Sequence, residues 1–172
     1  TLVNIALELI PESDEPFYVA DVGCGTGCIG LSIAKKRTQV RIYAVDVSRD
    51  AIECTKKNTQ NLELTDRVAI LNGQYLEPIP TNRPIDIVVS NPPYIPSKDV
   101  DTCEPEVSTY EPRVALDGGE DGYDMYRILI PQAAKRARVA IVVEVGIHQA
   151  EQVRLIMIEA GLKDISIHND LG

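Results

Sequence analysis

Runs of β-branched, apolar residues alternate with helical patterns along nearly the whole 172-residue chain. When strands alternate with helices, each helix carries the chain back to the end of the sheet at which the previous strand began. The strands therefore run parallel, and the helices cover both faces of the sheet. The sequence therefore predicts an α/β fold with a doubly wound, mostly parallel sheet. The expected strands are Phe17 to Asp21, Val40 to Asp46, Val68 to Leu71, Ile85 to Val89, Val139 to Val145 and Ile165 to Ile167. The expected helices are Ile29 to Lys36, Ala51 to Asn61, Tyr123 to Ala137 and His148 to Ala160, with Gly161 ending the last of them.

A glycine-rich loop follows the first expected strand, in the run Asp21-Val22-Gly23-Cys24-Gly25-Thr26-Gly27-Cys28. Glycines at alternate positions let the backbone turn sharply and approach a ligand without Cβ contacts, and the helix that follows presents free N–H groups at its start. The same region satisfies the Gly-x-Gly-x-x-Gly pattern of dinucleotide folds through Gly25, Gly27 and Gly30, which is weakly specific by itself. The loop predicts close binding of a ligand.

Two carboxylates indicate which ligand the loop binds. Asp46 ends the second strand, where a carboxylate can accept hydrogen bonds from both ribose hydroxyls of a nucleoside, or can instead cap the next helix. Asp21, at the loop entrance, opposes a pyrophosphate but favours the ammonium and sulfonium charges of S-adenosylmethionine, directly or through water. Its other possible role is to accept hydrogen bonds from the amides of the loop itself.

The fourth expected strand ends in Ser90-Asn91-Pro92-Pro93-Tyr94. Proline has no N–H to donate, so two prolines stop the strand and leave a rigid turn with one amide and one aromatic side chain. The alternative is a loop that merely terminates a strand. A long segment without clear period, Ile95 to Gly122, follows directly, and a loop at the carboxyl ends of parallel strands is placed to cover a ligand.

The net charge of −9, from 26 acidic and 17 basic residues, argues against direct nucleic-acid binding, because neutralised phosphates supply most of that affinity. It fits a basic protein partner better. The sequence has neither a membrane-length apolar stretch nor a signal peptide, so we expect a soluble, cytoplasmic protein without membrane contact. Its length and 44% hydrophobic residues predict one globular unit, and no feature sets the oligomeric state.

The four cysteines have neither C-x-x-C nor zinc-ligand spacing. We therefore expect no metal, and reduced thiols that are mostly buried, at Cys24, Cys28, Cys54 and Cys103.

The order Asp-x-Gly-x-Gly-x-Gly, Asp46 and Asn-Pro-Pro-Tyr resembles class I S-adenosylmethionine-dependent methyltransferases that act on amino nitrogens. The last motif occurs in DNA adenine methylases and in protein glutamine methylases. The run from Tyr110 to Gly122 is similar to HemK/PrmC-type enzymes, which methylate a glutamine of peptide chain release factors. The Glu144-Val145-Gly146-x-x-Gln149 pattern and Asn169 to Gly172 match this family too.

The resemblance implies a Rossmann-like class I methyltransferase sheet and a catalytic domain over residues 1–172 that lacks the family's last strand. It also implies that the family's N-terminal helical substrate-binding domain is absent, since the chain opens at Thr1.

The resemblance also implies the site residues. Catalytic roles fall on Asn91, Pro92, Pro93 and Tyr94, and cofactor contacts fall on Asp21, Gly23, Gly25, Gly27, Asp46, Val47, Gln74 and Asn91. Asn72 or Gln74 stands where the family commonly has an acidic residue for the adenine amino group, and an amide oxygen can accept that hydrogen bond. The Asn91 side-chain oxygen and the Pro92 carbonyl would hold the substrate amide, with Tyr94 stacked on it.

Other polar residues receive lesser roles. Neither histidine, His148 or His168, is expected to be catalytic. Glu111 is expected either to order the covering loop or to pair with a basic residue such as Arg113, and Glu144 either to lie at the site or to cap a helix.

Four functions stay open on the sequence. Methylation of a release-factor glutamine leads, and a ribosomal-protein glutamine is the nearest alternative. Methylation of adenine in DNA or RNA fits Asn-Pro-Pro-Tyr, but the charge and the match over Glu111 to Gly122 oppose it. A non-catalytic cofactor-binding adaptor is opposed by the intact motif from Asn91 to Tyr94.

Overall fold

The computed structural model describes residues 1–102 and 112–169. Its contacts divide the chain into two compact units, which are described separately. The sheet unit contains Thr1–Asn91 and Lys135–Val143, and the helical unit contains Pro92–Ala134 and Glu144–Asn169.

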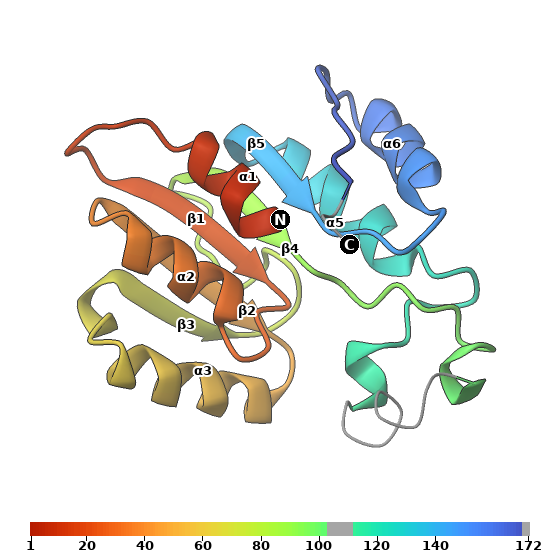
Figure 1. Ribbon diagram of the computed structural model, residues 1–172, viewed down its shortest axis with the longest axis horizontal. Helices are drawn as coiled ribbons and strands as arrows, with labels where there is room; N and C mark the ends of the chain where they lie inside the picture. Colours follow the sequence, from red (N-terminus) through yellow and green to blue (C-terminus); the bar gives the residue numbers. More distant parts are fainter. Residues whose placement is uncertain (103–111, 170–172) are drawn as a thin grey trace. The chain divides into compact units, whose positions relative to one another are not determined.

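The sheet unit has five parallel strands in the order β3-β2-β1-β4-β5 (Figure 1). Their bounds are Phe17–Val22 for β1, Val40–Asp46 for β2, Val68–Asn72 for β3, Ile85–Ser90 for β4 and Ala137–Val143 for β5. The strand order reverses next to β1, which pairs with β2 on one side and β4 on the other. Ligands bind at such a reversal, beyond the carboxyl ends of the strands. The predicted α/β fold with a parallel sheet is confirmed.

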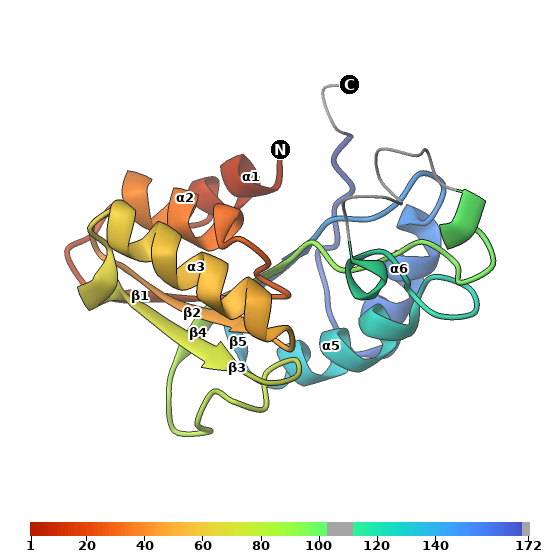
Figure 2. The ribbon, with the colours of Figure 1, turned by 90° about the horizontal axis from the view of Figure 1, so that it is seen from below.

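Three helices lie on one side of this sheet: α1 (Leu2–Glu8), α2 (Cys28–Lys36) and α3 (Arg49–Asn61) (Figure 2). Strand and helix residues such as Val19, Ile33 and Ile87 are completely buried in the core. Helix α1 is an addition to the sequence prediction. It is too short to show helical periodicity, but it buries Leu2, Ala6 and Leu7.

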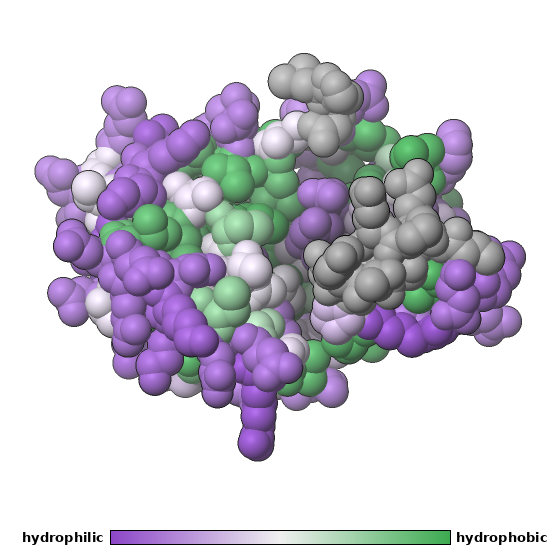
Figure 3. Space-filling view, turned by 60° about the horizontal axis from the view of Figure 1, so that its bottom comes forward, coloured by the Kyte–Doolittle hydropathy of each residue, from purple (hydrophilic) through white to green (hydrophobic). Residues whose placement is uncertain are grey.

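On the face that Figure 3 draws, hydrophilic residues predominate and hydrophobic ones show between them in small patches. Scattered apolar residues are normal on a protein surface and need no partner. The helices in the described part of the chain include none with the length and hydropathy of a membrane span.

The helical unit contains α5 (Asp124–Ala134) and α6 (Ala150–Glu159), which contact each other, and short 3-10 turns at Val100–Thr102 and Arg113–Ala115. Helix α5 buries Tyr126, Leu129, Ile130 and Ala133, the spacing of one helix face. Both helices are confirmed in type but are shorter than predicted. Gly161 has a φ of +85° and follows Ala160, the C-cap residue of α6, as expected for a residue that ends a helix.

Three expectations need correction. Ile165 to Ile167 is not a strand, because it pairs with no strand among the described residues and Ile167 is half exposed. The strand predicted from Val139 to Val145 instead spans Ala137–Val143, where its residues pair with β4. Of the cysteines within the described ranges, only Cys24 is buried, whereas Cys28 is exposed.

Arg136 binds the backbone of the segment that connects β3 and β4. Its guanidinium group donates to the carbonyl oxygens of Leu76, Ile79, Pro80 and Arg83, at 2.8 to 3.4 Å. The substitution Arg136→Met keeps most of the side-chain volume but leaves these carbonyls without their donor. We expect the free energy of unfolding in urea to fall by about 2 to 3 kcal/mol, the usual range for charged hydrogen bonds. Lys135→Met, at the exposed neighbouring position, is the control, and equal stability of the two variants would contradict the role of Arg136.

Candidate functional site

The glycine loop after β1 has a backbone that favours glycine at alternate positions. Gly23, Gly25 and Gly27 have φ values of +68°, +55° and +79°, in the left-handed region that side chains rarely adopt. A Cβ atom on Gly25 would have no heavy-atom neighbour within 4 Å, so open space lies beside the loop there. The predicted loop is therefore present, and its backbone is accessible to a ligand at Gly25.

Asp46 holds this loop in place. One carboxylate oxygen, Oδ2, accepts a hydrogen bond from the Gly25 N–H at 2.8 Å, and Oδ1 accepts one from the Ser48 N–H at 2.9 Å. The N-cap of α3 is Ser48, whose side chain accepts from the Ala51 N–H, so the capping alternative for Asp46 is wrong. Each carboxylate oxygen has further acceptor capacity, which ribose hydroxyls can use.

Asp21 is completely buried at the end of β1. Its Oδ2 accepts a hydrogen bond from the Gly30 N–H at 2.8 Å, whereas Oδ1 has no partner within the described part of the chain. A Cβ on Gly30 would lie 2.9 Å from Oδ2, so only glycine fits beside this carboxylate. An amide in the first turn of α2, which a phosphate would use in a dinucleotide fold, is thus already taken by an acidic group.

Burial raises the pKa of Asp21 from 3.8 to about 7; the bond from Gly30 lowers it, and the nearby Asp46 charge raises it. Between these two values the folded protein binds more protons than the unfolded chain, so the free energy of unfolding decreases as the pH rises from about 4 to about 7. The contribution of this carboxyl is fully present below pH 4 and fully lost above pH 7. We expect Asp21→Asn to remove this slope, a relative change of roughly 2 to 4 kcal/mol.

Urea unfolding at a series of pH values without cofactor measures this difference. Asp14→Asn, at an exposed position of the sheet unit, is the control and should run parallel to the wild type. If the curve for Asp21→Asn also runs parallel to the wild type, the carboxyl has no raised pKa.

Helix α3 supplies contacts to the loop that the sequence analysis missed. The Thr55 hydroxyl donates to the Gly25 carbonyl at 2.9 Å, and the Asn58 side chain donates to the Thr26 carbonyl at 2.8 Å. Their spacing of three residues, which places both on one helix face, is the only signal in the sequence. Thr55 also lies 3.5 Å from the Cys24 sulfur, and burial raises the pKa of that thiol to about 12. Cys24 is therefore a neutral packing residue.

Val47, after β2, was predicted to contact the cofactor, and Asn72 or Gln74, at or beyond the end of β3, was predicted to contact its adenine. The Asn72 side-chain N–H group donates to the Asp46 and Val47 carbonyls, which leaves its oxygen as an acceptor. Val47 follows Asp46 and its apolar side chain is 51% exposed. Gln74 is exposed, beyond the end of β3. All three are available to a ligand, with Asn72 fixed more firmly than Gln74.

The end of β4 is tied to the end of β1. The Ser90 hydroxyl donates to the Val22 carbonyl at 2.6 Å and is fully buried. Asn91 comes next, with an exposed side chain that makes no hydrogen bond to the described residues. The sheet unit thus gathers Asn91, the glycine loop and Asp46 at the carboxyl ends of neighbouring strands.

Pro92, Pro93 and Tyr94 begin the helical unit. Pro92 is buried and Tyr94 is half-buried. Burial, together with the negative charge of Glu144, raises the pKa of the Tyr94 hydroxyl, so this group stays protonated at neutral pH.

The segment after Tyr94 is organised by backbone and ionic contacts. Ile95 pairs with Asp117 in an isolated parallel bridge. Arg113 binds the carboxylates of Asp101 and Asp117 and the carbonyl of Ser97. Glu111, predicted to order this segment or to pair with Arg113, lies outside the described residues, as do Cys103, Tyr110 and the terminal 170–172. The described part of the segment from Ile95 to Gly122 is therefore built around Arg113.

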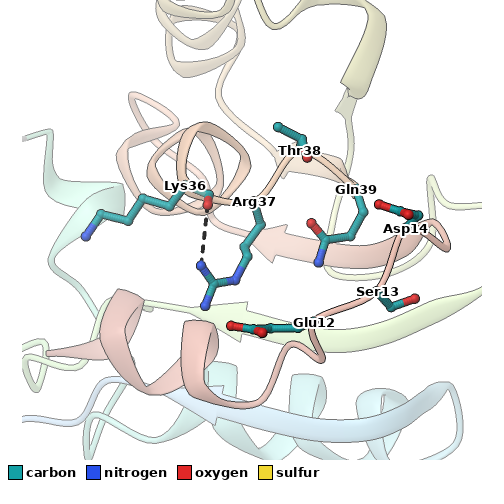
Figure 4. Close-up of a pocket in the computed structure, with 7 residues that line it drawn as sticks. All are labelled: Glu12, Ser13, Asp14, Lys36, Arg37, Thr38 and Gln39. Carbon is teal, nitrogen blue, oxygen red and sulfur yellow. Dashed lines mark hydrogen bonds between the residues drawn. The ribbon is translucent and has the colours of Figure 1, made fainter.

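A hollow of about 450 Å³ lies elsewhere in the sheet unit. Figure 4 shows its lining, the segments 12–14 and 36–39, which precede β1 and β2. It is therefore at the amino ends of these strands, whereas the glycine loop follows their carboxyl ends. The predicted site residues have no part in it.

A five-stranded parallel sheet with a glycine loop after β1 and a carboxylate at the end of β2 defines a Rossmann-like α/β fold. The chain belongs to the methyltransferase small domain family, whose model matches residues 4–105. It is 42% identical to the release factor glutamine methyltransferase of Clostridium acetobutylicum, over 98% of this chain and 60% of the relative. It is 40% identical to that of Geobacter sulfurreducens, over 87% of this chain and 52% of the relative. The chain thus spans somewhat more than half the length of these relatives.

A solved structure supports the fold alone. The chain resembles precorrin-6y C5,15-methyltransferase from Geobacter metallireducens with a TM-score of 0.63 at 13% identity. The match covers 92% of this chain and 69% of that one. The fold is therefore that of Rossmann-like class I methyltransferases.

Proposed function

We propose that this chain transfers a methyl group from S-adenosylmethionine to the side-chain amide nitrogen of a glutamine in a peptide chain release factor. The observation that carries the proposal is the sequence Asn91-Pro92-Pro93-Tyr94 directly after β4. Strand β4 pairs with β1, the strand that leads into the glycine loop. The relatives named release factor glutamine methyltransferase support the substrate.

The residues of the sheet unit fit S-adenosylmethionine. The unpartnered oxygen of Asp21 suits a cationic ammonium group, and Asp46 suits the ribose hydroxyls. Gly23, Gly25 and Gly27 let the ligand approach the backbone, and Val47 with Gln74 or Asn72 would contact the adenine. When bound, S-adenosylmethionine supplies an electrophilic methyl group on a positively charged sulfur.

The substrate nitrogen needs help from the chain, because the lone pair of an amide is delocalised into its carbonyl. The Asn91 side-chain oxygen and the Pro92 backbone carbonyl accept one amide hydrogen each, which draws electron density toward the nitrogen and orients its lone pair. Pro92 and Pro93 keep this turn rigid. Tyr94 stacks on the planar amide, and its ring face favours the developing positive charge by roughly 0.5 to 2 kcal/mol. The methylated nitrogen is acidic, so it loses its proton without a strong general base.

The charge of the chain agrees with a protein substrate. At −9 it is suited to a basic surface on a protein partner and poorly suited to the phosphates of a nucleic acid. A release factor as substrate places the reaction in the cytoplasm.

Transfer of labelled methyl groups tests the proposal. The intact protein is incubated with labelled S-adenosylmethionine and a class 1 release factor or its Gln→Ala variant, with a ribosomal protein, DNA and RNA in parallel. We expect the release factor to be labelled and the Gln→Ala variant to stay unlabelled. Labelling of the ribosomal protein or a nucleic acid instead would contradict the assignment of the release factor as the substrate. Cofactor binding without transfer to any of them would indicate an adaptor.

A further inference from the structure

We infer that Gln149 is a positioning residue, which fixes the backbone at Tyr94 by linking the Tyr94 carbonyl to the Gly146 N–H through two side-chain hydrogen bonds. The inference rests on the proposed function, because it assigns a second layer of support to the turn that holds the substrate amide. All of the contacts that carry it lie within the helical unit.

The Gln149 side chain uses both ends of its amide. Its Nε2 donates to the backbone carbonyl of Tyr94 at 2.8 Å, and its Oε1 accepts from the Gly146 N–H at 3.0 Å. Gln149 is only 8% exposed, although it stands at the N-cap of α6 and makes no capping bond with its side chain. A buried amide that satisfies two backbone groups on separate segments links those segments rigidly.

Glycines bring the backbone close enough for this link. A Cβ on Gly122 would lie 2.5 Å from the Tyr94 carbonyl oxygen and 2.7 Å from the Gln149 Nε2. A Cβ on Gly146 would lie 2.9 Å from the Tyr94 ring and 2.7 Å from the Gln149 Oε1. A side chain at either position would therefore displace the bonded groups.

A third glycine, in the segment from Ile95 to Gly122, also lies against the turn. A Cβ on Gly118 would lie 2.8 Å from the Tyr94 Cα and 2.9 Å from the Pro93 carbonyl oxygen. The Gly118 N–H donates to the Ile95 carbonyl, and the Ile95 N–H donates to the Leu116 carbonyl. Gln149 and these glycines therefore lie directly against the Pro93-Tyr94 backbone and limit the space in which it can move.

Two substitutions of Gln149 distinguish the effects of its two side-chain hydrogen bonds. Gln149→Glu keeps an acceptor for Gly146 but loses the donor to Tyr94, and Gln149→Ala loses both. The matched controls are Gln152→Glu and Gln152→Ala, at an exposed position on α6. In the intact protein we expect the Gln149 variants to lower kcat by about tenfold or more, the effect of one lost hydrogen bond to a charged or buried partner. The dissociation constant for S-adenosylmethionine should stay within about threefold, since the residues assigned to the cofactor lie elsewhere in the chain.

Amide hydrogen exchange provides a readout that does not need activity. In Gln149→Ala the Gly146 amide should exchange at least about tenfold faster, with the Ile95 and Gly118 amides also accelerated. Gly118→Ala, which disturbs the same turn from another side, should lower kcat in the same way. Unchanged exchange and unchanged kcat in the Gln149 variants would overturn the inference, as would an equal loss of cofactor affinity. If the wild type transfers no methyl group, the proposed function fails, and the exchange rates still decide whether Gln149 fixes the turn.

Discussion

Replacing Asn91 with alanine lowers kcat for methyl transfer by about 100- to 1,000-fold, the cost of removing one preorganised hydrogen-bonding group at a reacting centre. The reason is that Asn91 supplies one of the two acceptors for the substrate amide, and its exposed side chain has no structural bond within the described residues. The dissociation constant for S-adenosylmethionine should change by a much smaller factor, about threefold, because Asn91 is only one of the residues assigned to the cofactor, and the glycine loop, Asp21 and Asp46 are untouched. Single-turnover rates and equilibrium binding measure the two quantities.

Asn82→Ala is the matched control for this substitution. Asn82 is an exposed asparagine shortly before β4, whereas Asn91 directly follows the strand. It should leave both rate and affinity unchanged. A variant at Asn91 that retains more than about a third of the wild-type rate would remove this residue from the mechanism.

Replacing Asp46 with alanine raises the dissociation constant for S-adenosylmethionine by about 100-fold, which corresponds to two lost charged hydrogen bonds to the ribose. The substitution also leaves the Gly25 and Ser48 N–H groups without their acceptor, so the glycine loop loses its attachment to β2. Both effects act in the same direction on cofactor affinity. Calorimetric titration measures the affinity directly.

Asp66→Ala serves as the control, because it removes the same charge from an exposed position before β3. Its affinity should equal that of the wild type. If the two variants bind S-adenosylmethionine equally well, Asp46 contacts neither the ribose nor a loop that the cofactor requires.

The sheet was predictable because its strands are short, mostly apolar runs that are rich in β-branched residues and bounded by turns. The glycine loop was predictable because the left-handed backbone at Gly23, Gly25 and Gly27 favours glycine, and glycine is visible in the sequence. Asp46 was predictable because it ends the next strand along the chain. Ile165 to Ile167 shows the limit. A short β-branched run forms a strand only when a neighbour pairs with it, and pairing is not a local property.

The polar support of the site could not be predicted in the same way. The contact of Thr55 with the Gly25 carbonyl joins residues 30 positions apart, and that of Gln149 with the Tyr94 carbonyl joins residues 55 apart. Asp86 similarly accepts from the Tyr18 N–H across 68 positions and pairs with Arg138. Periodicity and propensity describe neighbours in sequence, so such partners emerge only from the folded chain.

Mass spectrometry of the release factor after reaction with the intact protein and S-adenosylmethionine tests the central claim most directly. The account predicts one added methyl group on the side-chain nitrogen of a single glutamine, present with the wild type and with Asn82→Ala and nearly absent with Asn91→Ala. A methyl group on a different type of residue, or an equally modified glutamine with Asn91→Ala, would contradict it.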